Sequence, residues 1–136
     1  YPEYEDEKQA LKELRDFEFL ESIEPVVSRQ QIIDAQNRVS RVHVDDSLYD
    51  YILQIVRATR TDERIRLGAS TRGAQFLVMA SKAMALINGR DYVVPDDVKS
   101  LAPMVLGHRI ILKTRTYIRD AEELVKEITS KVAVPV

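Results

Sequence analysis

The chain has 136 residues, of which 45% are hydrophobic and 31% charged, and it contains no cysteine. This composition is too apolar and too balanced in charge for a disordered protein, and the length is enough to bury the core of one globular domain. No segment approaches the roughly 20 apolar residues that cross a bilayer, and the lack of cysteine excludes disulfides, thiolate zinc sites and a cysteine nucleophile. The chain opens with Tyr-Pro and not with methionine, so we expect a piece of a longer protein.

The charges are distributed unevenly around a net charge of −2. Residues 1–24 hold nine acids and three bases, whereas the remaining residues carry a net charge of +4. We therefore interpret residues 1–24 as an acidic helix with a connector, and residues 25–136 as a helical domain. The positive excess is concentrated in a short stretch of five arginines, Arg57, Arg60, Arg64, Arg66 and Arg72.

Capping signals and apolar periodicity predict a mainly helical bundle with three very short extended segments. The longest expected helix follows Ser70 and ends at Asn88-Gly89, and its apolar residues fall on more than one face, so we expect it to be buried from several sides. The other helices are expected over 3–15, from Ser28, from Asp45 or Asp46 to about Arg60, from Pro95 with a kink or end at Pro103, and over 116–131. The extended segments are expected at 42–44, 92–94 and 108–112, with a packed connector over 17–25 and a polar loop over 61–68.

Several kinds of catalytic site are missing from the sequence. No GxxxxGK motif is present to cradle phosphates, no strand ends in paired acids, and no serine lies in a nucleophile elbow. The acid pairs Asp45-Asp46 and Asp96-Asp97 are placed at helix starts, where capping explains them. We expect no metal site, because the only histidines are His43 and His108, and we expect the isolated chain to catalyse nothing.

The most informative segment runs from Leu67 to Gly73. Gly68 and Ala69 allow a tight turn, Ser70 caps the next helix, and Arg72 lies in its first turn. A cation at this end opposes the helix dipole, at a cost of a few tenths of a kcal/mol, unless a negative group compensates it. That group is either a bound anion or the carboxylate of a neighbouring acid.

The segment Gly68-Ala69-Ser70-Thr71-Arg72 resembles the sensor 2 motif in the lid domain of MoxR-family AAA+ ATPases. Thr71 stands where the family usually has proline. Further similar segments follow in the family's order over roughly residues 1–112: Tyr1-Pro2 with Glu7, 42–44, 50–52, 56–60, 89–93, 95–98, and 105–106 with His108-Arg109.

The resemblance implies an AAA+ lid-type helical bundle that packs over ATP held by a core outside this chain. Arg72 would then contact the γ-phosphate, with Gly68, Ala69, Ser70 and Thr71 beside the nucleotide and Mg²⁺ bound mainly by the core. It also implies a cytoplasmic ring of ATPase subunits that hydrolyses ATP to remodel clients in a chaperone-like way, often with von Willebrand factor A domain proteins as partners. Neither nucleic acid nor a membrane is an expected partner.

A free-standing helical adaptor or a winged-helix-like DNA-binding module is the alternative, with the arginines of 57–72 facing phosphates. The negative net charge and the lack of a recognition helix count against it. For Arg57 and Arg60 the simplest interpretation is a cation at a helix end. For His108 it is a structural hydrogen bond, and for residues 116–131 it is a helix that closes the bundle.

Overall fold

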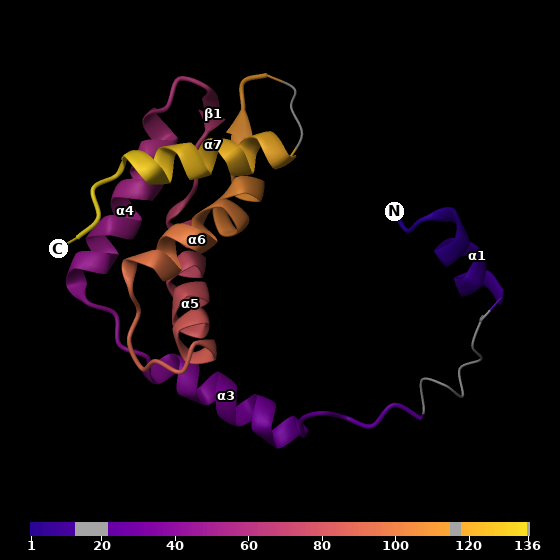
Figure 1. The fold of residues 1–136 in the computed structure, drawn as a ribbon. Coiled ribbons are helices and arrows are strands. Elements are labelled where there is room, and N and C mark those ends of the chain that lie inside the picture. The colour runs from indigo at the N-terminus through magenta and orange to yellow at the C-terminus, as the bar shows by residue number, and fades with distance from the viewer. Residues whose placement is uncertain (13–21, 115–117, 136) are drawn as a thin grey trace. The chain divides into compact units, whose positions relative to one another are not determined.

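The computed structural model describes residues 1–12, 22–114 and 118–135 (Figure 1). It divides into two compact units, Tyr1–Ile33 and Asp34–Val136. The expected division after residue 24 stays a prediction. The mainly helical fold is confirmed, because the described strands form only one sheet of two short strands.

The first unit contains helix α1, Tyr4–Lys12, which begins one residue after the predicted start. Glu5, Asp6 and Glu7 occupy its first turn, where the helix dipole favours acids, and no side chain of α1 is buried. The expected residues 13–15 of this helix and 17–21 of the connector lie outside the described residues. The prediction of a packed connector is wrong for residues 22–25, which are exposed.

Helix α3, Arg29–Arg41, begins at the predicted capping box. The Ser28 N–H donates to Oε1 of Gln31 at 2.7 Å, and the Gln31 N–H donates to Oγ of Ser28 at 3.2 Å. These reciprocal bonds satisfy two N–H groups that the helix cannot satisfy itself. The sequence prediction of this start is therefore confirmed.

Helix α4, Asp46–Thr61, is capped by Asp45, whose carboxylate accepts the Ser47 N–H at 2.9 Å. The predicted stripe on one face of α4 lies in the core of the second unit. Its buried members are Leu48, Ile52, Ile55, Val56 and Thr59.

Strand β1, Ile65–Leu67, pairs antiparallel with strand β2, Ile111–Leu112. The prediction of a polar loop over 61–68 is therefore wrong for residues 65–67. Ile65 is buried and lies opposite Leu112, a partner that no local pattern could reveal. The extended segments around His43 and Tyr92 are confirmed by a parallel bridge, in which the Val93 N–H donates to the His43 carbonyl at 3.0 Å.

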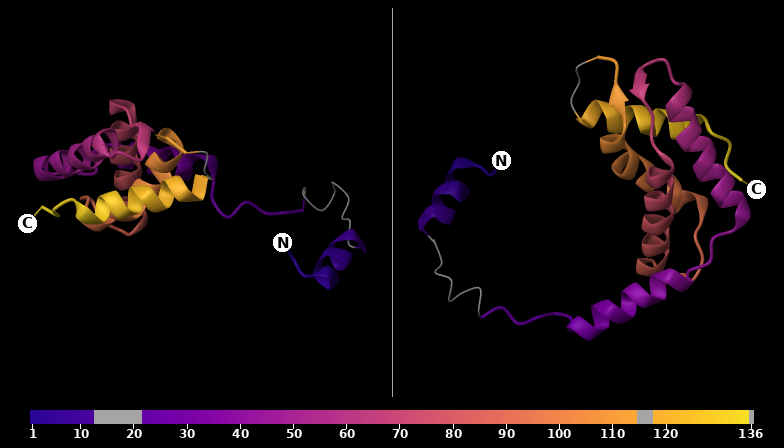
Figure 2. Two further views of the ribbon diagram at one scale, coloured as in Figure 1. Left: turned by 90° about the horizontal axis from the view of Figure 1, so that it is seen from above. Right: turned by 180° about the vertical axis from the view of Figure 1, so that it is seen from behind.

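Helix α5, Thr71–Ile87, packs against α4 and against α6, Pro95–Leu106, and α6 packs against α7, Ile118–Lys131 (Figures 1 and 2). Gly89, at φ +74°, follows the end of α5 as predicted. The expectation that α5 is buried from several sides is wrong. Its buried residues form one stripe, Gly73, Ala74, Leu77, Ser81 and Ala85, and Phe76, Met79 and Ile87 are exposed.

The structure decides between the two alternatives for Pro103 and corrects the segment that follows α6. Helix α6 continues past Pro103 to Leu106, so the proline does not end it. Residues 108 and 109 of the predicted extended segment belong instead to a short 3-10 turn, and the extended backbone begins at Ile110. The predicted stripe of α7 is buried at Ala121, Leu124, Val125 and Ile128. Within the described ranges, no helix combines the length and the apolar character that a membrane span requires.

Candidate functional site

The loop before α5 is held by the last turns of α4. Thr59 is fully buried, its hydroxyl donates to the Val56 carbonyl at 2.6 Å, and the same oxygen accepts the Ala69 N–H at 3.0 Å. Nε of Arg60 donates to the Ala69 carbonyl at 2.8 Å. Both backbone groups of Ala69 are therefore tied to α4, and the start of α5 has a fixed position relative to it.

Gly68 allows this close approach. A Cβ added at Gly68 would lie 2.7 Å from Cα of Arg60 and 2.7 Å from the Thr59 carbonyl oxygen. The sequence indicated a tight turn at Gly68, and the structure adds that α4 leaves no room there for a side chain. The lack of a side chain at Gly68 therefore lets the backbone of the loop pack directly against α4.

The N-terminus of α5 is capped as predicted and presents unused donors. Oγ of Ser70 accepts the Gly73 N–H at 3.4 Å. Within residues 1–12, 22–114 and 118–135, the N–H groups of Thr71 and Arg72 have no protein acceptor. Their dipoles and the helix dipole make this end of α5 locally positive.

Arg72 extends from this turn with an exposed side chain. The salt bridge to a neighbouring acid is not formed among the residues that the structure describes, and the first turn of α5 contains no acid. An unpaired guanidinium beside free N–H groups forms a site for an anion, and a phosphate oxygen matches both kinds of donor.

Arg109 lies near the same part of α5. The sequence did not predict that it lies there. Its guanidinium carbon is 4.7 Å from the centre of the Phe76 ring, and Nη1 donates to the Val105 carbonyl at 2.6 Å. Phe76 follows Arg72 by one helical turn, so both lie on one side of α5. His108 contacts Arg109, and its Nδ1 lies 3.0 Å from the Met104 carbonyl, which agrees with the expected structural hydrogen bond. In the sequence, the i, i+4 spacing of Arg72 and Phe76 was the one signal that these two residues lie on the same side of the helix.

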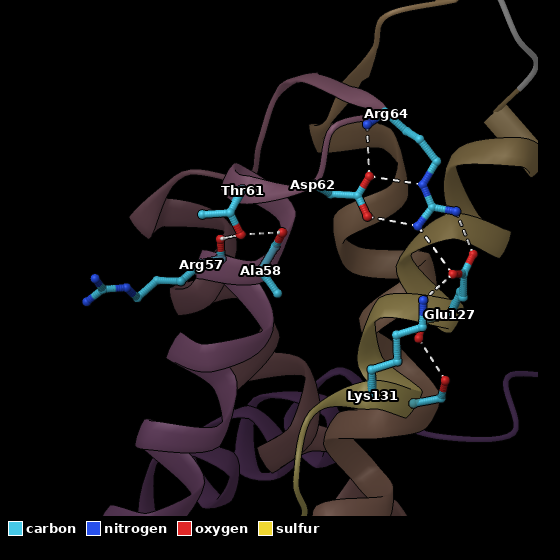
Figure 3. Close-up of polar contacts among 8 residues, drawn as sticks. Arg57, Ala58, Thr61, Asp62, Arg64, Glu127 and Lys131 are labelled. Atoms are coloured by element: carbon cyan, nitrogen blue, oxygen red, sulfur yellow. Dashed lines mark hydrogen bonds and ion pairs between the residues drawn. The ribbon is translucent and has the colours of Figure 1, made fainter.

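Of the remaining arginines of the 57–72 stretch, Arg60 lies beside the start of α5, whereas Arg64 is held in a group of ion pairs elsewhere. Arg64 donates to Asp62 at 2.8 Å and to Glu127 of α7 at 2.8 Å, and Glu127 also pairs with Lys131, whereas Arg57 points away from this group (Figure 3). We call Asp62, Arg64, Glu127 and Lys131 the α7 clip. Hydrogen bonds from Arg64 lower the pKa of Asp62 to about 2, and bonds from Arg64 and Lys131 lower the pKa of Glu127 to about 2.

The acid pairs serve the helix starts, as the sequence indicated. Asp45 caps α4, and Asp97 accepts the Val94 N–H at 3.0 Å beside its ion pair with Arg90. Burial alone would raise the pKa of Asp97, but bonds from Arg90 and the Val94 N–H outweigh it and lower the pKa. In the described part of the chain, no group of three or more His, Asp and Glu side chains could hold a metal ion.

The sequence of this chain matches a known protein family. Residues 57–129 match the family model of the AAA lid domain, which covers more than half of the chain. The chain belongs to the AAA lid domain family. The matched region includes the end of α4, all of α5 and α6, and most of α7.

The relatives of this lid include MoxR proteins. It is 40% identical over 138 residues to the uncharacterized protein YeaC of Bacillus subtilis, a match that covers 100% of this chain and 43% of that protein. It is 34% identical over 112 residues to Chaperone MoxR1 of Mycobacterium tuberculosis, covering 76% of this chain and 29% of that protein. The crystal structure of a "putative ATPase" from Cytophaga hutchinsonii superposes with a TM-score of 0.77 at 32% identity, covering 100% of this chain and 44% of that one.

The lid spans less than half the length of each of these three relatives. The resemblance to the lid of a MoxR-family AAA+ ATPase, which the sequence indicated, is confirmed by the family match and these relatives.

Proposed function

We propose that this lid senses the phosphates of ATP bound by an AAA+ core, and that Arg72 is the residue that contacts the γ-phosphate. The observation that carries the proposal is the exposed Arg72 side chain, which has no ion pair among the described residues and lies in the first turn of α5. A transferring phosphoryl group develops charge on its outer oxygens, and a positioned guanidinium stabilises that charge.

The surroundings of Arg72 support a precise placement of this cation. Thr59 accepts the N–H of Ala69, and Arg60 donates to the carbonyl of Ala69. Ser70 caps the helix that carries Arg72. A rigid base reduces the entropy that the side chain loses on binding. Thr71, in place of the family's usual proline, leaves an N–H at the first helical position that is free to donate to a phosphate oxygen.

Ser70 and Thr71 then lie on the surface of the lid that faces the nucleotide, and Gly68 and Ala69 lie behind them. We assign Gly68 and Ala69 to positioning, because α4 uses the backbone N–H and carbonyl of Ala69 and fills the space beside Gly68. Ser70 and Thr71 lie at the exposed start of the helix, closer in role to Arg72.

For the whole protein we propose ATP hydrolysis with Mg²⁺, both bound mainly by a core that precedes the lid. The relative from Mycobacterium tuberculosis is named a chaperone, which supports remodelling of client proteins as the purpose of the hydrolysis. A homo-oligomeric ring, in which each lid contacts the neighbouring core, a cytoplasmic location, and von Willebrand factor A domain proteins as clients or cofactors belong to the same proposal.

The structure weakens the alternative of a DNA-binding module. It rested on the arginines of 57–72 as one basic face, but Arg64 is paired with Asp62 and Glu127. Charges that are already paired contribute little to phosphate binding.

The test is ATP turnover by the full-length protein that carries the core. Arg72→Ala should lower turnover by at least about tenfold, because it removes a cation that acts on the transferring phosphoryl group. Arg57→Ala, which removes an exposed arginine from α4, is the control and should leave turnover within about twofold. Arg72 is exposed, so the free energy of unfolding should change by less than about 0.5 kcal/mol. Unchanged turnover in Arg72→Ala would remove Arg72 from the mechanism.

A further inference from the structure

A second positively charged feature lies at the opposite end of α5 from Arg72. A hollow of about 510 Å³ is lined by residues from the end of α3, the end of α5 and the segments that follow these two helices. We call it the arginine hollow. Its walls include Arg38, Arg41 and Arg90, together with Val42, Leu86 and Asp91. Because α5 has 17 residues, its two ends are about 25 Å apart at 1.5 Å per residue, so this hollow is separate from the Arg72 site.

Arg90 forms a fixed wall of the hollow. Its Nη2 and Nη1 donate to the two carboxylate oxygens of Asp97 at 2.7 and 2.8 Å, and Nη1 also donates to the Tyr92 carbonyl at 3.0 Å. Asp97 is buried, so this bidentate ion pair is part of the internal structure of the fold.

Arg38 and Arg41 are different, because neither has an ion pair within the described part of the chain. They are three residues apart on α3, and like charges at this spacing repel one another. Arg90 also lines the hollow, but Asp97 neutralises its charge, so Arg38 and Arg41 supply the positive charge. Asp91 is the one acid in its lining, which leaves a positive excess.

Stabilisation of the α3 dipole does not account for both arginines. The last turn of α3 does favour cations. However, Nζ of Lys82 already donates to the Ser40 carbonyl at 3.2 Å, and the Val42 N–H donates to the Val39 carbonyl at 3.2 Å. The guanidiniums of Arg38 and Arg41 provide further donors there, which no residue in the described part of the chain uses.

We propose that the arginine hollow binds an acidic segment of a partner protein. Arg38 and Arg41 would pair with carboxylates, whose planar geometry matches a guanidinium. Val42 and Leu86 would contact an apolar side chain beside those carboxylates. The hollow has the size of a ligand pocket, larger than a single phosphate needs. The carboxylate of Asp91 would repel a dianion, but it can accept an N–H of a bound peptide.

The probe is a labelled peptide of alternating leucine and glutamate residues, added to the intact 136-residue chain and followed by fluorescence anisotropy. The double variant Arg38→Gln/Arg41→Gln should weaken binding by about tenfold or more, since each lost charged hydrogen bond costs affinity. The matched control is Arg57→Gln/Arg66→Gln, which removes the same charge from exposed positions elsewhere and should change the Kd by less than about twofold. A leucine–glutamine peptide of the same length should not bind.

Arg38→Lys/Arg41→Lys keeps the charge and should retain part of the affinity, which separates loss of charge from loss of fold. Circular dichroism of each variant checks the fold directly. Equal weakening by both glutamine double variants would overturn the proposal, because it would show attraction to net charge alone. Displacement of the peptide by inorganic phosphate at the peptide's own concentration would overturn it in favour of a phosphate site. A peptide that does not bind the unmodified chain would overturn it as well.

Discussion

The hydroxyl of Thr59 in α4 accepts the backbone N–H of Ala69 at 3.0 Å, although the two residues are ten positions apart and both are buried. This bond connects the end of α4 to the loop from which α5 and Arg72 begin. Since a buried N–H without an acceptor is costly, the bond contributes to the stability of the fold as well as to the position of Arg72.

Thr59→Val should lower the free energy of unfolding by about 1–3 kcal/mol. Valine has nearly the shape of threonine, so the change removes the acceptor of the Ala69 N–H with little change in packing. Urea unfolding of the chain measures the effect. Thr59→Ser keeps the hydroxyl and is the matched variant, so it should retain the hydrogen bond and lose only the packing of one methyl group. A Thr59→Val chain as stable as the unmodified one would show that this hydrogen bond does not contribute to stability.

Gly68→Ala should also destabilise the chain, by about 1–3 kcal/mol, because the new Cβ meets backbone atoms of α4 at 2.7 Å and the loop must shift. The shift moves the start of α5, so amide NMR signals of Ser70, Thr71 and Arg72 should change together with those of Thr59 and Arg60. Gly89→Asn is the comparison, since Gly89 has φ +74° with open space around it and asparagine tolerates this conformation better than other residues. A Gly68→Ala chain as stable as the unmodified one would show that the loop and α4 can move apart without loss of stability.

The α7 clip should make stability depend on pH in the acid range. The pKa of Asp62 falls from 3.8 to about 2 in the folded chain, and the pKa of Glu127 falls from 4.5 to about 2. Lowered values mean that the unfolded chain binds protons more readily, so the contribution of the clip is present above about pH 5 and is lost as the pH falls toward 2. Arg64 and Glu127 are partly exposed, so solvent and salt screen the ion pairs.

Arg64→Gln tests this dependence. The difference in urea midpoint between the unmodified chain and Arg64→Gln should be largest at neutral pH and should shrink between pH 5 and pH 2. Arg66→Gln, two residues away, removes an exposed arginine that has no ion pair among the described residues, and it should show no comparable pH-dependent difference. A difference for Arg64→Gln that stays constant down to pH 2 would contradict the role of the two carboxylates.

Local sequence signals were sufficient for the helices and for much of the candidate site. Ser28 with Gln31, Asp45, Ser70 and Gly89 act through bonds or backbone angles within a few residues, so their effect can be read along the chain. The cap at Ser70 also placed Arg72 in the first turn of α5. This follows from residue order alone.

Other features needed partners that are distant in sequence. Strand β1 exists because Ile65 pairs with Leu112, and Arg64 is neutralised by Glu127, 63 residues away. The apolar residues of α5 could not show which face is covered, because coverage depends on where α4 and α6 pack, and Phe76 stays exposed beneath Arg109.

The order of residues thus determined where helices start and stop, because capping and periodicity act over one or two turns. The tertiary structure alone decided which side chains are buried, which arginines are paired, and how firmly the Arg72 turn is held by Thr59 and Arg60. Those outcomes depend on contacts whose energy appears only after the chain has brought distant segments together.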